Sequence, residues 1–215
     1  STGNSYDITY GADGNVRTVK DALGNVTTNE YDALGRMIKR TMPSGGTYSF
    51  TYTGTGRIKT CTTPDNNTTT YNYDHFDRLV EVVNPDGGKI AFTYDPSGDV
   101  LSITDALGNT TAYEYDLLGR KTKQTDAEGG TITYYYDNDG NLVKEEYPLG
   151  GHIRYGYDAA GRVSSITNAK GNTTGFEYDE LGRLVKMTDA LGNTYTYNYD
   201  EVGNLVKETD PKGNA

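Results

Sequence analysis

The chain has 215 residues, including 20 Tyr, 27 Gly, one Cys and no Trp, and its 30 acidic against 20 basic side chains give a formal net charge of −10. The negative charges are spread along the chain without a block of either sign, which argues against nucleic acid and anionic membrane surfaces as partners. No apolar run approaches the ~20 residues of a membrane helix. Tyr, Thr and Val favour strands, and frequent glycine clusters interrupt every segment before helical length. The composition therefore predicts an all-β chain with almost no helix.

A tyrosine recurs every 21 residues along the whole chain, without an insertion or deletion. The spacing predicts a single array over residues 1–215, made of ten 21-residue units and truncated within a repeat at both ends. The segment from Ser1 to Thr9 fits the end of a unit, with Gly3 and Asn4 at its turn. The ten tyrosines, taken below as position 1 of each unit, are Tyr10, Tyr31, Tyr52, Tyr73, Tyr94, Tyr115, Tyr136, Tyr157, Tyr178 and Tyr199.

Each unit contains two predicted turns. Position 5 is Gly in nine of the ten units, and so is position 15, with Asp77 and Asn66 as the two exceptions. Asn tolerates left-handed backbone better than most residues, so both positions are expected to require a positive φ. Residues 116–120 and 105–109 illustrate the two turns, in which an Asp is followed three residues later by Gly. This pattern is typical of a type I turn followed by a glycine bulge.

Two short strands are predicted between the turns, such as residues 183–188 and 194–199. In the second of these, Tyr195, Tyr197 and Tyr199 alternate with polar residues, so all three rings lie on one face of the sheet. Because the stripe recurs in every unit, we expect ladders of tyrosines whose rings pack on one another and whose hydroxyls meet water. Exposed rings could instead stack on sugars, which leaves a glycan-binding surface as the alternative.

The odd period has a consequence for the sheet. Successive side chains of a strand point to opposite faces of the sheet, so equivalent residues 21 positions apart would point to opposite faces. For them to point to the same face, each 21-residue unit must contain one irregularity that shifts the alternation by one residue. Either one connection has an even loop or one strand carries a β-bulge in every unit. Adjacent apolar residues at positions 7 and 8, such as Leu184-Val185, fit a bulge there or two partly covered faces. A repeated bulge would bend the sheet consistently, which predicts one curved, spiralling antiparallel sheet of about twenty strands.

The motif Tyr-Asp-x-x-Gly-Arg stands intact in four units, and Asp-Ala-Leu-Gly-Asn recurs at the other turn. In these motifs, repeated over all 215 residues, the chain resembles the YD-repeat, or Rhs-repeat, family. The resemblance implies a spiral of β-hairpins, a partial β-solenoid, that closes into a hollow shell in large secreted or surface proteins. Many bacterial members enclose a C-terminal toxin, and nothing here matches the self-cleaving module that follows their repeats. The intact motifs are residues 31–36, 115–120, 157–162 and 178–183, and the partner motif is at residues 21–25, 105–109 and 189–193.

Groups that could carry chemistry are sparse. His75 and His152 occupy unrelated positions of the repeat and are interpreted as surface side chains, and Cys61 as a small buried apolar residue. Repeated aspartates such as Asp95 and Asp116 could form a calcium ladder, but each lies where a turn needs a hydrogen-bond acceptor, and we favour turn capping. The sequence therefore predicts no catalytic, cofactor-binding or metal-binding residues, no cofactor and no enzymatic activity.

These features predict a structural scaffold: a segment of a hollow shell that encapsulates or displays a C-terminal toxin or effector domain absent from this fragment. The expected localisation is extracellular or on the cell surface of a bacterium. The expected partners are the remainder of the parent polypeptide, with edge-to-edge self-association and carbohydrate as further candidates. The alternative function is an adhesion surface for glycans or proteins.

Overall fold

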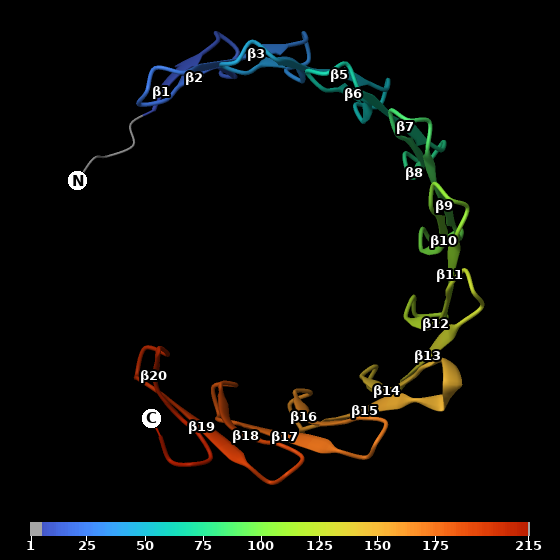
Figure 1. Ribbon diagram of the computed structural model, residues 1–215, viewed down its shortest axis with the longest axis vertical. Coiled ribbons are helices and arrows are strands. Elements are labelled where there is room, and N and C mark those ends of the chain that lie inside the picture. Colours follow the sequence, from blue (N-terminus) through green and yellow to red (C-terminus); the bar gives the residue numbers. More distant parts are fainter. Residues whose placement is uncertain (1–5, 215) are drawn as a thin grey trace. The chain divides into compact units, whose positions relative to one another are not determined.

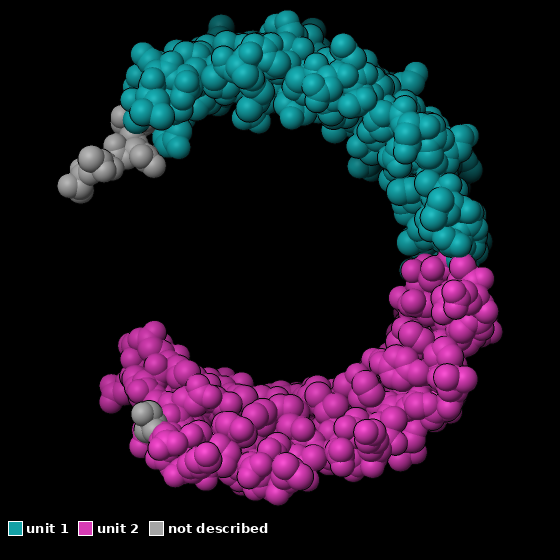
Figure 2. Space-filling view, viewed as in Figure 1, with its two compact units in different colours: residues 1–110 teal, residues 111–215 magenta. Residues whose placement is uncertain are grey.

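The computed structural model describes residues 6–214, so the turn expected at Gly3 and Asn4 lies outside the described residues. The chain divides into two compact units, residues 1–110 and residues 111–215, coloured teal and magenta in Figure 2. The 21-residue spacing of the tyrosines continues across this boundary. That the ten repeats form a single array stays a prediction.

Both units consist of short strands of four to six residues. The first contains β1 (Asp7–Tyr10), β2 (Val16–Lys20), β3 (Val26–Tyr31), β4 (Met37–Thr41), β5 (Thr47–Tyr52), β6 (Ile58–Thr62), β7 (Thr68–Tyr73), β8 (Leu79–Val83), β9 (Lys89–Tyr94) and β10 (Val100–Thr104). The second contains β11 (Thr110–Tyr115, whose first residue belongs to the first unit), β12 (Lys121–Thr125), β13 (Thr131–Tyr136), β14 (Leu142–Glu146), β15 (His152–Tyr157), β16 (Val163–Thr167), β17 (Thr173–Tyr178), β18 (Leu184–Thr188), β19 (Thr194–Tyr199) and β20 (Leu205–Thr209).

Within each unit every strand pairs antiparallel with the next one along the chain. Each unit taken by itself follows an arc that bends to one side (Figure 1). The only helical element among residues 6–214 is a short 3-10 turn, η1 (Pro148–Gly150). The expectation of an all-β chain of antiparallel hairpins is confirmed.

The two kinds of turn have the same geometry. At the first, the Asp158 N–H donates to the Arg162 carbonyl at 2.9 Å and the Gly161 N–H donates to the Asp158 carbonyl at 3.0 Å. At the second, Asp189 exchanges the corresponding bonds with residues 192 and 193 at 3.0 and 2.9 Å. Gly161 has φ +77°, as the type I turn with a glycine bulge requires. Both connections therefore have odd loops of the same length.

Each 21-residue repeat contains one β-bulge, which keeps equivalent side chains of successive repeats on the same face of the sheet. In the hairpin of β15 and β16, Gly156 pairs with Ser165 but Tyr157 pairs with Val163, so Ser164 is left without a partner. The same shift occurs beside the position 1 tyrosine in all ten first-type hairpins. The bulge falls at positions 7 and 8, where the sequence carries its adjacent apolar residues. Of the two explanations for the odd period, the bulge is the one that the structure contains.

Each unit is one sheet thick. None of residues 6–214 is buried, and both faces of the sheet meet solvent. Cys61, expected to be a buried apolar residue, is therefore only half-buried in β6, because a single layer has no interior. Stability must come from hydrogen-bonded ladders and from contacts between neighbouring strands instead of from a core.

Three non-glycine residues have a positive φ: Asn66 (59°), Asp77 (61°) and Leu149 (73°). The first two replace the turn glycines of their units, so the backbone conformation is kept where the glycine is lost. Leu149 lies in η1, in the unit whose second turn starts with Tyr147 in place of Asp or Asn. These three turns carry strain that glycine would remove.

Replacing Gly161 by alanine is expected to lower the free energy of unfolding by about 1–2 kcal/mol, because an L-residue pays that cost in the left-handed region. A Cβ at Gly161 would meet nothing within 4 Å, so the effect isolates the backbone. The matched control is Asp77→Gly, which should raise stability through the same term. Urea denaturation of the two variants checks both signs, and a neutral Gly161→Ala would contradict the turn assignment.

Candidate inter-repeat coupling site

The aspartate at position 2 caps its own turn. The Asp158 Oδ1 atom accepts the backbone N–H groups of Ala160 at 2.9 Å and Arg162 at 3.0 Å, while Oδ2 accepts the Arg162 Nε–H at 2.7 Å. This one carboxylate therefore orders the turn and anchors the arginine at position 6. The same three bonds occur in the units that start at Tyr31, Tyr73, Tyr115 and Tyr178.

The anchored arginine reaches into the following unit. The Arg162 guanidinium carbon lies 4.8 Å from the centre of the Tyr178 ring, and Nη1 donates to the Asp179 carbonyl at 3.0 Å. We call this arrangement the arginine clamp: an arginine at position 6 held by the aspartate at position 2 and stacked on the next position 1 tyrosine. Its members are Arg36 on Tyr52, Arg78 on Tyr94, Arg120 on Tyr136, Arg162 on Tyr178 and Arg183 on Tyr199, at 4.5–4.8 Å.

The hydroxyl of the position 1 tyrosine bonds back to the bulge of the preceding unit. The ladder between β16 and β17 ends at the pair of Ser165 and Gly175, so the Val163 carbonyl lies beyond its last pair. The Tyr178 hydroxyl donates to this carbonyl at 2.9 Å. A bulge that bends the sheet thus exposes a backbone acceptor, and the tyrosine supplies its donor. The same bond, at 2.6–3.0 Å, is made by Tyr31, Tyr52, Tyr73, Tyr94, Tyr136, Tyr157 and Tyr199.

The expected ring-on-ring packing of the tyrosines is wrong. Among residues 6–214 the only pair of aromatic rings in contact is His75 with Phe76, at 3.8 Å between centroids. Guanidinium groups lie against six of the position 1 rings instead, at 4.5–5.0 Å from the ring centre, where a cation is attracted to the face of the ring. The sequence signal for this arrangement was an arginine at position 6. Two short strands, such as β16 and β17, separate it from the next position 1 tyrosine.

Turn capping gives the array a predictable response to acid. Hydrogen bonds from the Arg162 backbone and side chain hold the pKa of Asp158 below its ordinary value, and the Asn193 side-chain amide lowers the pKa of Asp189. A carboxyl whose pKa is lower in the folded state stabilises the fold above its unfolded pKa of 3.8, and this contribution disappears as the pH falls through the folded pKa. Ten further aspartates are shifted in the same direction: Asp13, Asp21, Asp32, Asp74, Asp105, Asp116, Asp137, Asp179, Asp200 and Asp210.

We expect the urea midpoint to stay level from about pH 7 to about pH 5 and to fall steeply below about pH 4. Asp158→Asn, which keeps an acceptor but cannot be protonated in this range, should shrink that fall at the cost of lower stability at neutral pH. A midpoint independent of pH down to about pH 2 would contradict the capping role.

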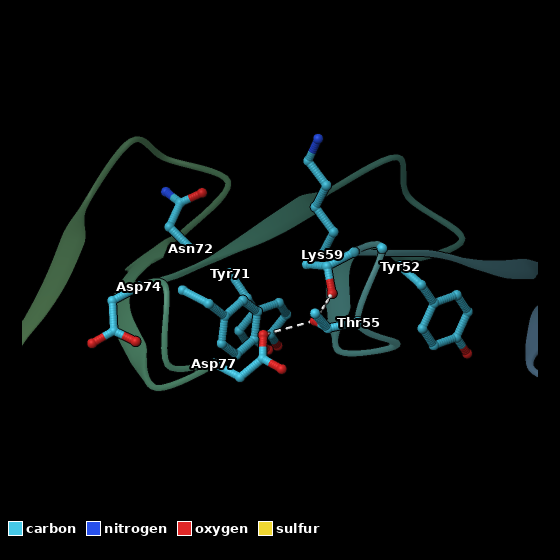
Figure 3. A pocket seen from close by; sticks show the side chains of 10 residues that line it. Tyr52, Thr55, Lys59, Tyr71, Asn72, Asp74 and Asp77 are labelled. Atoms are coloured by element: carbon cyan, nitrogen blue, oxygen red, sulfur yellow. Dashed lines mark hydrogen bonds between the residues drawn. The ribbon is translucent and has the colours of Figure 1, made fainter. Parts of the chain in front are cut away.

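One of the junctions without the clamp contains a pocket. In the unit that starts at Tyr52, Thr53 replaces the aspartate, and its hydroxyl accepts the Arg57 backbone N–H at 3.1 Å and bonds the Thr55 hydroxyl at 2.8 Å. The Arg57 side chain is exposed and makes no ion pair or ring contact within the described part of the chain. A pocket of about 500 Å³ lies there, lined in part by Thr53, Thr55 and Tyr73 (Figure 3). Asp77, which replaces the position 5 glycine of the next unit, also lines it and accepts the Thr55 hydroxyl at 2.7 Å.

The other groups singled out in the sequence are not brought together. His75 lies at an exposed turn tip beside Phe76, and His152 is the half-buried first residue of β15 in the other unit. Asp116 is occupied by its own turn and by Arg120. Within residues 6–214 no group of three or more His, Cys, Asp or Glu side chains is arranged to hold a metal ion. No helix in the same range has the length and apolar character that crossing a bilayer requires.

Comparison with known proteins follows the repeat. The RHS Repeat family matches residues 94–131, 122–152, 136–173, 157–194 and 178–215, and the Teneurin YD-shell family matches residues 2–90. No curated protein matches the chain.

Solved structures share the fold. The crystal structure of TcdB2-TccC3-TEV is similar over 95% of this chain and 12% of its own length, with a TM-score of 0.78 and 19% identity. The TcdB2-TccC3 structure without its hypervariable C-terminal region gives a TM-score of 0.63 and 18% identity over 96% of this chain and 14% of that one. A Tc holotoxin pore of Photorhabdus luminescens gives a TM-score of 0.61 and 19% identity over 95% and 13% of the two chains.

At such identities these structures show the fold alone, and the chain spans only 12–14% of their length. The family matches carry more, because RHS repeats together cover residues 94–215 and a YD-shell match covers most of the remainder. The chain belongs to the YD-repeat, or RHS-repeat, family, and its role is that of a structural shell repeat.

Proposed function

We propose that the chain is a wall segment of a hollow shell that encloses a C-terminal toxin or effector domain of the same parent polypeptide, in a secreted or cell-surface bacterial protein. The coupling between units carries this proposal. The bulge and the tyrosine hydroxyl bond, together with the arginine clamp at five of the junctions, join one hairpin to the next. The sheet of each compact unit bends to one side (Figure 1). Such a layer is suited to be a wall between the inside and the outside of a shell, because it is one sheet thick and is stabilised without a hydrophobic core.

The turn tips supply a second argument, since they present apolar residues that no part of either unit covers. Leu107, Leu191 and Leu149 at position 14 are 87–107% exposed, and Leu118 and Leu181 at position 4 are 76–77% exposed. Exposed apolar rows mark contact surfaces in soluble proteins. We assign these tips to contacts with the remainder of the parent polypeptide, such as neighbouring turns of the wall.

Enclosure can be tested in the full-length parent protein by limited proteolysis. The proposal predicts that the domain after the repeats resists protease in the intact protein and is digested when the wall is weakened by Arg120→Ala, Arg162→Ala and Arg183→Ala together. The matched control is Arg57→Ala, which removes an arginine from the same position without breaking a clamp. A downstream domain that is digested equally in intact and weakened proteins contradicts enclosure, whereas the shell fold itself would stand.

The glycan-binding alternative loses support, because guanidinium groups already cover six of the position 1 rings on which a sugar would stack, five in clamps and the Tyr31 ring by Arg17. No observation favours a catalytic role, and we propose that the chain is not an enzyme. A glycan array and a broad hydrolase screen test these two points. Saturable sugar binding, or turnover lost on a point substitution, would contradict the scaffold proposal.

The open strands β1 and β20 predict self-association of the isolated chain. Each pairs with a neighbour on one side only, and every residue of β1 is exposed. Unpaired strand edges template pairing with another copy. Light scattering is expected to show a mass that rises with protein concentration, and Val206→Pro in β20 should reduce this rise. A strictly monomeric chain at all concentrations would contradict the prediction.

A further inference from the structure

The pocket beside Tyr73 corresponds to a clamp without its guanidinium. At the equivalent place in the junction of the units starting at Tyr157 and Tyr178, Arg162 lies 4.8 Å from the ring centre and bonds both a carboxylate and a backbone carbonyl. At Tyr73 no guanidinium covers the ring, because Thr53 offers no carboxylate to hold Arg57. The hydroxyl of Tyr73 still bonds the Ile58 carbonyl at 2.9 Å, so the ring keeps the orientation found in the clamped units.

The charge around this ring is reversed as well. Asp77 brings a carboxylate to a position that is Gly in nine units, and it does so at a positive φ that an L-residue rarely adopts. One of its oxygens accepts the Thr55 hydroxyl, which fixes the carboxylate at the pocket. Figure 3 shows the Lys59 side chain extending to the opposite side of the strands from Asp77. Lys59 is also among the residues that line the pocket, but the Asp77 carboxylate makes no ion pair within residues 6–214. The pocket therefore holds an aromatic ring and an anchored carboxylate that no cation of the described chain pairs with.

We propose that this pocket is a binding site for the arginine side chain of a protein segment. The guanidinium stacks on the Tyr73 ring, as the internal arginines do on theirs, and pairs with the Asp77 carboxylate. A backbone carbonyl and the hydroxyls of Thr53 and Thr55 accept its remaining N–H groups. The strain at Asp77 is consistent with a functional position, since glycine would be more stable there. The site goes beyond the shell role, because it gives the wall a specific docking point.

The test uses Nα-acetyl-arginine-amide as the probe and NMR titration of the 215-residue chain as the readout. The expected dissociation constant is about 1–10 mM, with shifts confined to residues 53–55 and 71–77. Nα-acetyl-citrulline-amide, which has the same shape without the charge, should bind at least about tenfold more weakly, the equivalent of about 1.4 kcal/mol.

Two variants test the site without endangering the fold, because both restore the common sequence of the repeat. Thr53→Asp should draw Arg57 over Tyr73 and fill the pocket, and Asp77→Gly should remove the carboxylate and relieve the backbone. Each is expected to weaken probe binding at least about tenfold while raising the urea midpoint. The control is Asp65→Asn, which removes one negative charge from another turn of the same unit and should leave binding unchanged.

Equal binding of the citrulline probe, equal binding by Thr53→Asp, or no binding would overturn the proposal, as would selective binding of N-acetylglucosamine in place of the arginine probe. The full-length parent protein then distinguishes the source of the arginine. If the probe binds the isolated chain but not the parent, the occupant is a segment of the same polypeptide. If it binds both, the occupant comes from another protein.

Discussion

Replacing Tyr178 by alanine is expected to lower the free energy of unfolding by about 3 kcal/mol, from the lost ring and the lost hydroxyl bond together. The substitution removes the surface on which Arg162 stacks and leaves the Val163 carbonyl at the bulge without its donor. Tyr178→Phe separates the two effects, because it keeps the ring. It should cost about 1 kcal/mol, the usual worth of one hydrogen bond. Urea denaturation, combined with amide exchange in β16 and β17, measures both.

The matched control for this prediction is Tyr10→Phe. Tyr10 occupies the same position of its unit, but it is 62% exposed and its hydroxyl makes no hydrogen bond within residues 6–214. Its replacement should change stability by less than about 0.5 kcal/mol. If Tyr178→Phe proved as neutral as Tyr10→Phe, the bond between tyrosine and bulge would contribute nothing to the coupling of units.

The second large effect is expected at Arg162. Alanine there removes two bonds to Asp158, one bond to the Asp179 carbonyl and the contact with the Tyr178 ring, and should cost about 2 kcal/mol. Lysine restores one charge but neither the planar stacking nor the paired bonds, so Arg162→Lys should recover less than half of the loss. An exposed ion pair alone is worth at most about 1 kcal/mol, so a larger loss identifies the contribution of the ring and the carbonyl.

Arg57 supplies the control at the same position of another unit. It has the arginine without the aspartate, and Arg57→Ala should therefore be close to neutral. A double-mutant cycle of Arg162→Ala with Tyr178→Ala should give a coupling free energy of about 1 kcal/mol. A coupling free energy of zero in this cycle would show that the clamp does not couple neighbouring repeats. So would an Arg57→Ala variant that lowers stability as much as Arg162→Ala.

Much of the fold could be predicted from the sequence, because the signals were local. Glycine recurring at positions 5 and 15, with Asn66 in place of one of them, predicted a positive φ there, and turns such as the one at Gly161 have that geometry. The odd period demanded either an even loop or a bulge, yet the choice depended on the hydrogen bonds of two different strands. Those bonds place the bulge opposite Tyr157 and its equivalents. The pattern of residues along one strand does not show which residues of the neighbouring strand they pair with, so it could not locate the bulge.

The coupling site was only half predictable for the same reason. The role of Asp158 in its turn follows from residues within five positions, whereas the contact of Arg162 with Tyr178 depends on how far the next hairpin is displaced. Tyrosine was expected to pack on tyrosine, because the tyrosine stripe recurs in every repeat and would form ladders when hairpins stack in register. In the structure the Arg162 guanidinium, and not a second ring, lies against the Tyr178 ring. The pocket at Tyr73 could not be foreseen, because it arises from substitutions in two successive units, Thr53 and Asp77.

Amide hydrogen exchange on the chain carrying Arg162→Ala and Tyr178→Phe tests the central claim most directly, since coupling between units determines how far a local opening spreads. We predict that protection falls together in β15, β16, β17 and β18, on both sides of the altered junction. A loss of protection confined to the turn at residues 158–162, with the neighbouring strands as protected as in the unaltered chain, would contradict the coupling of units by this motif.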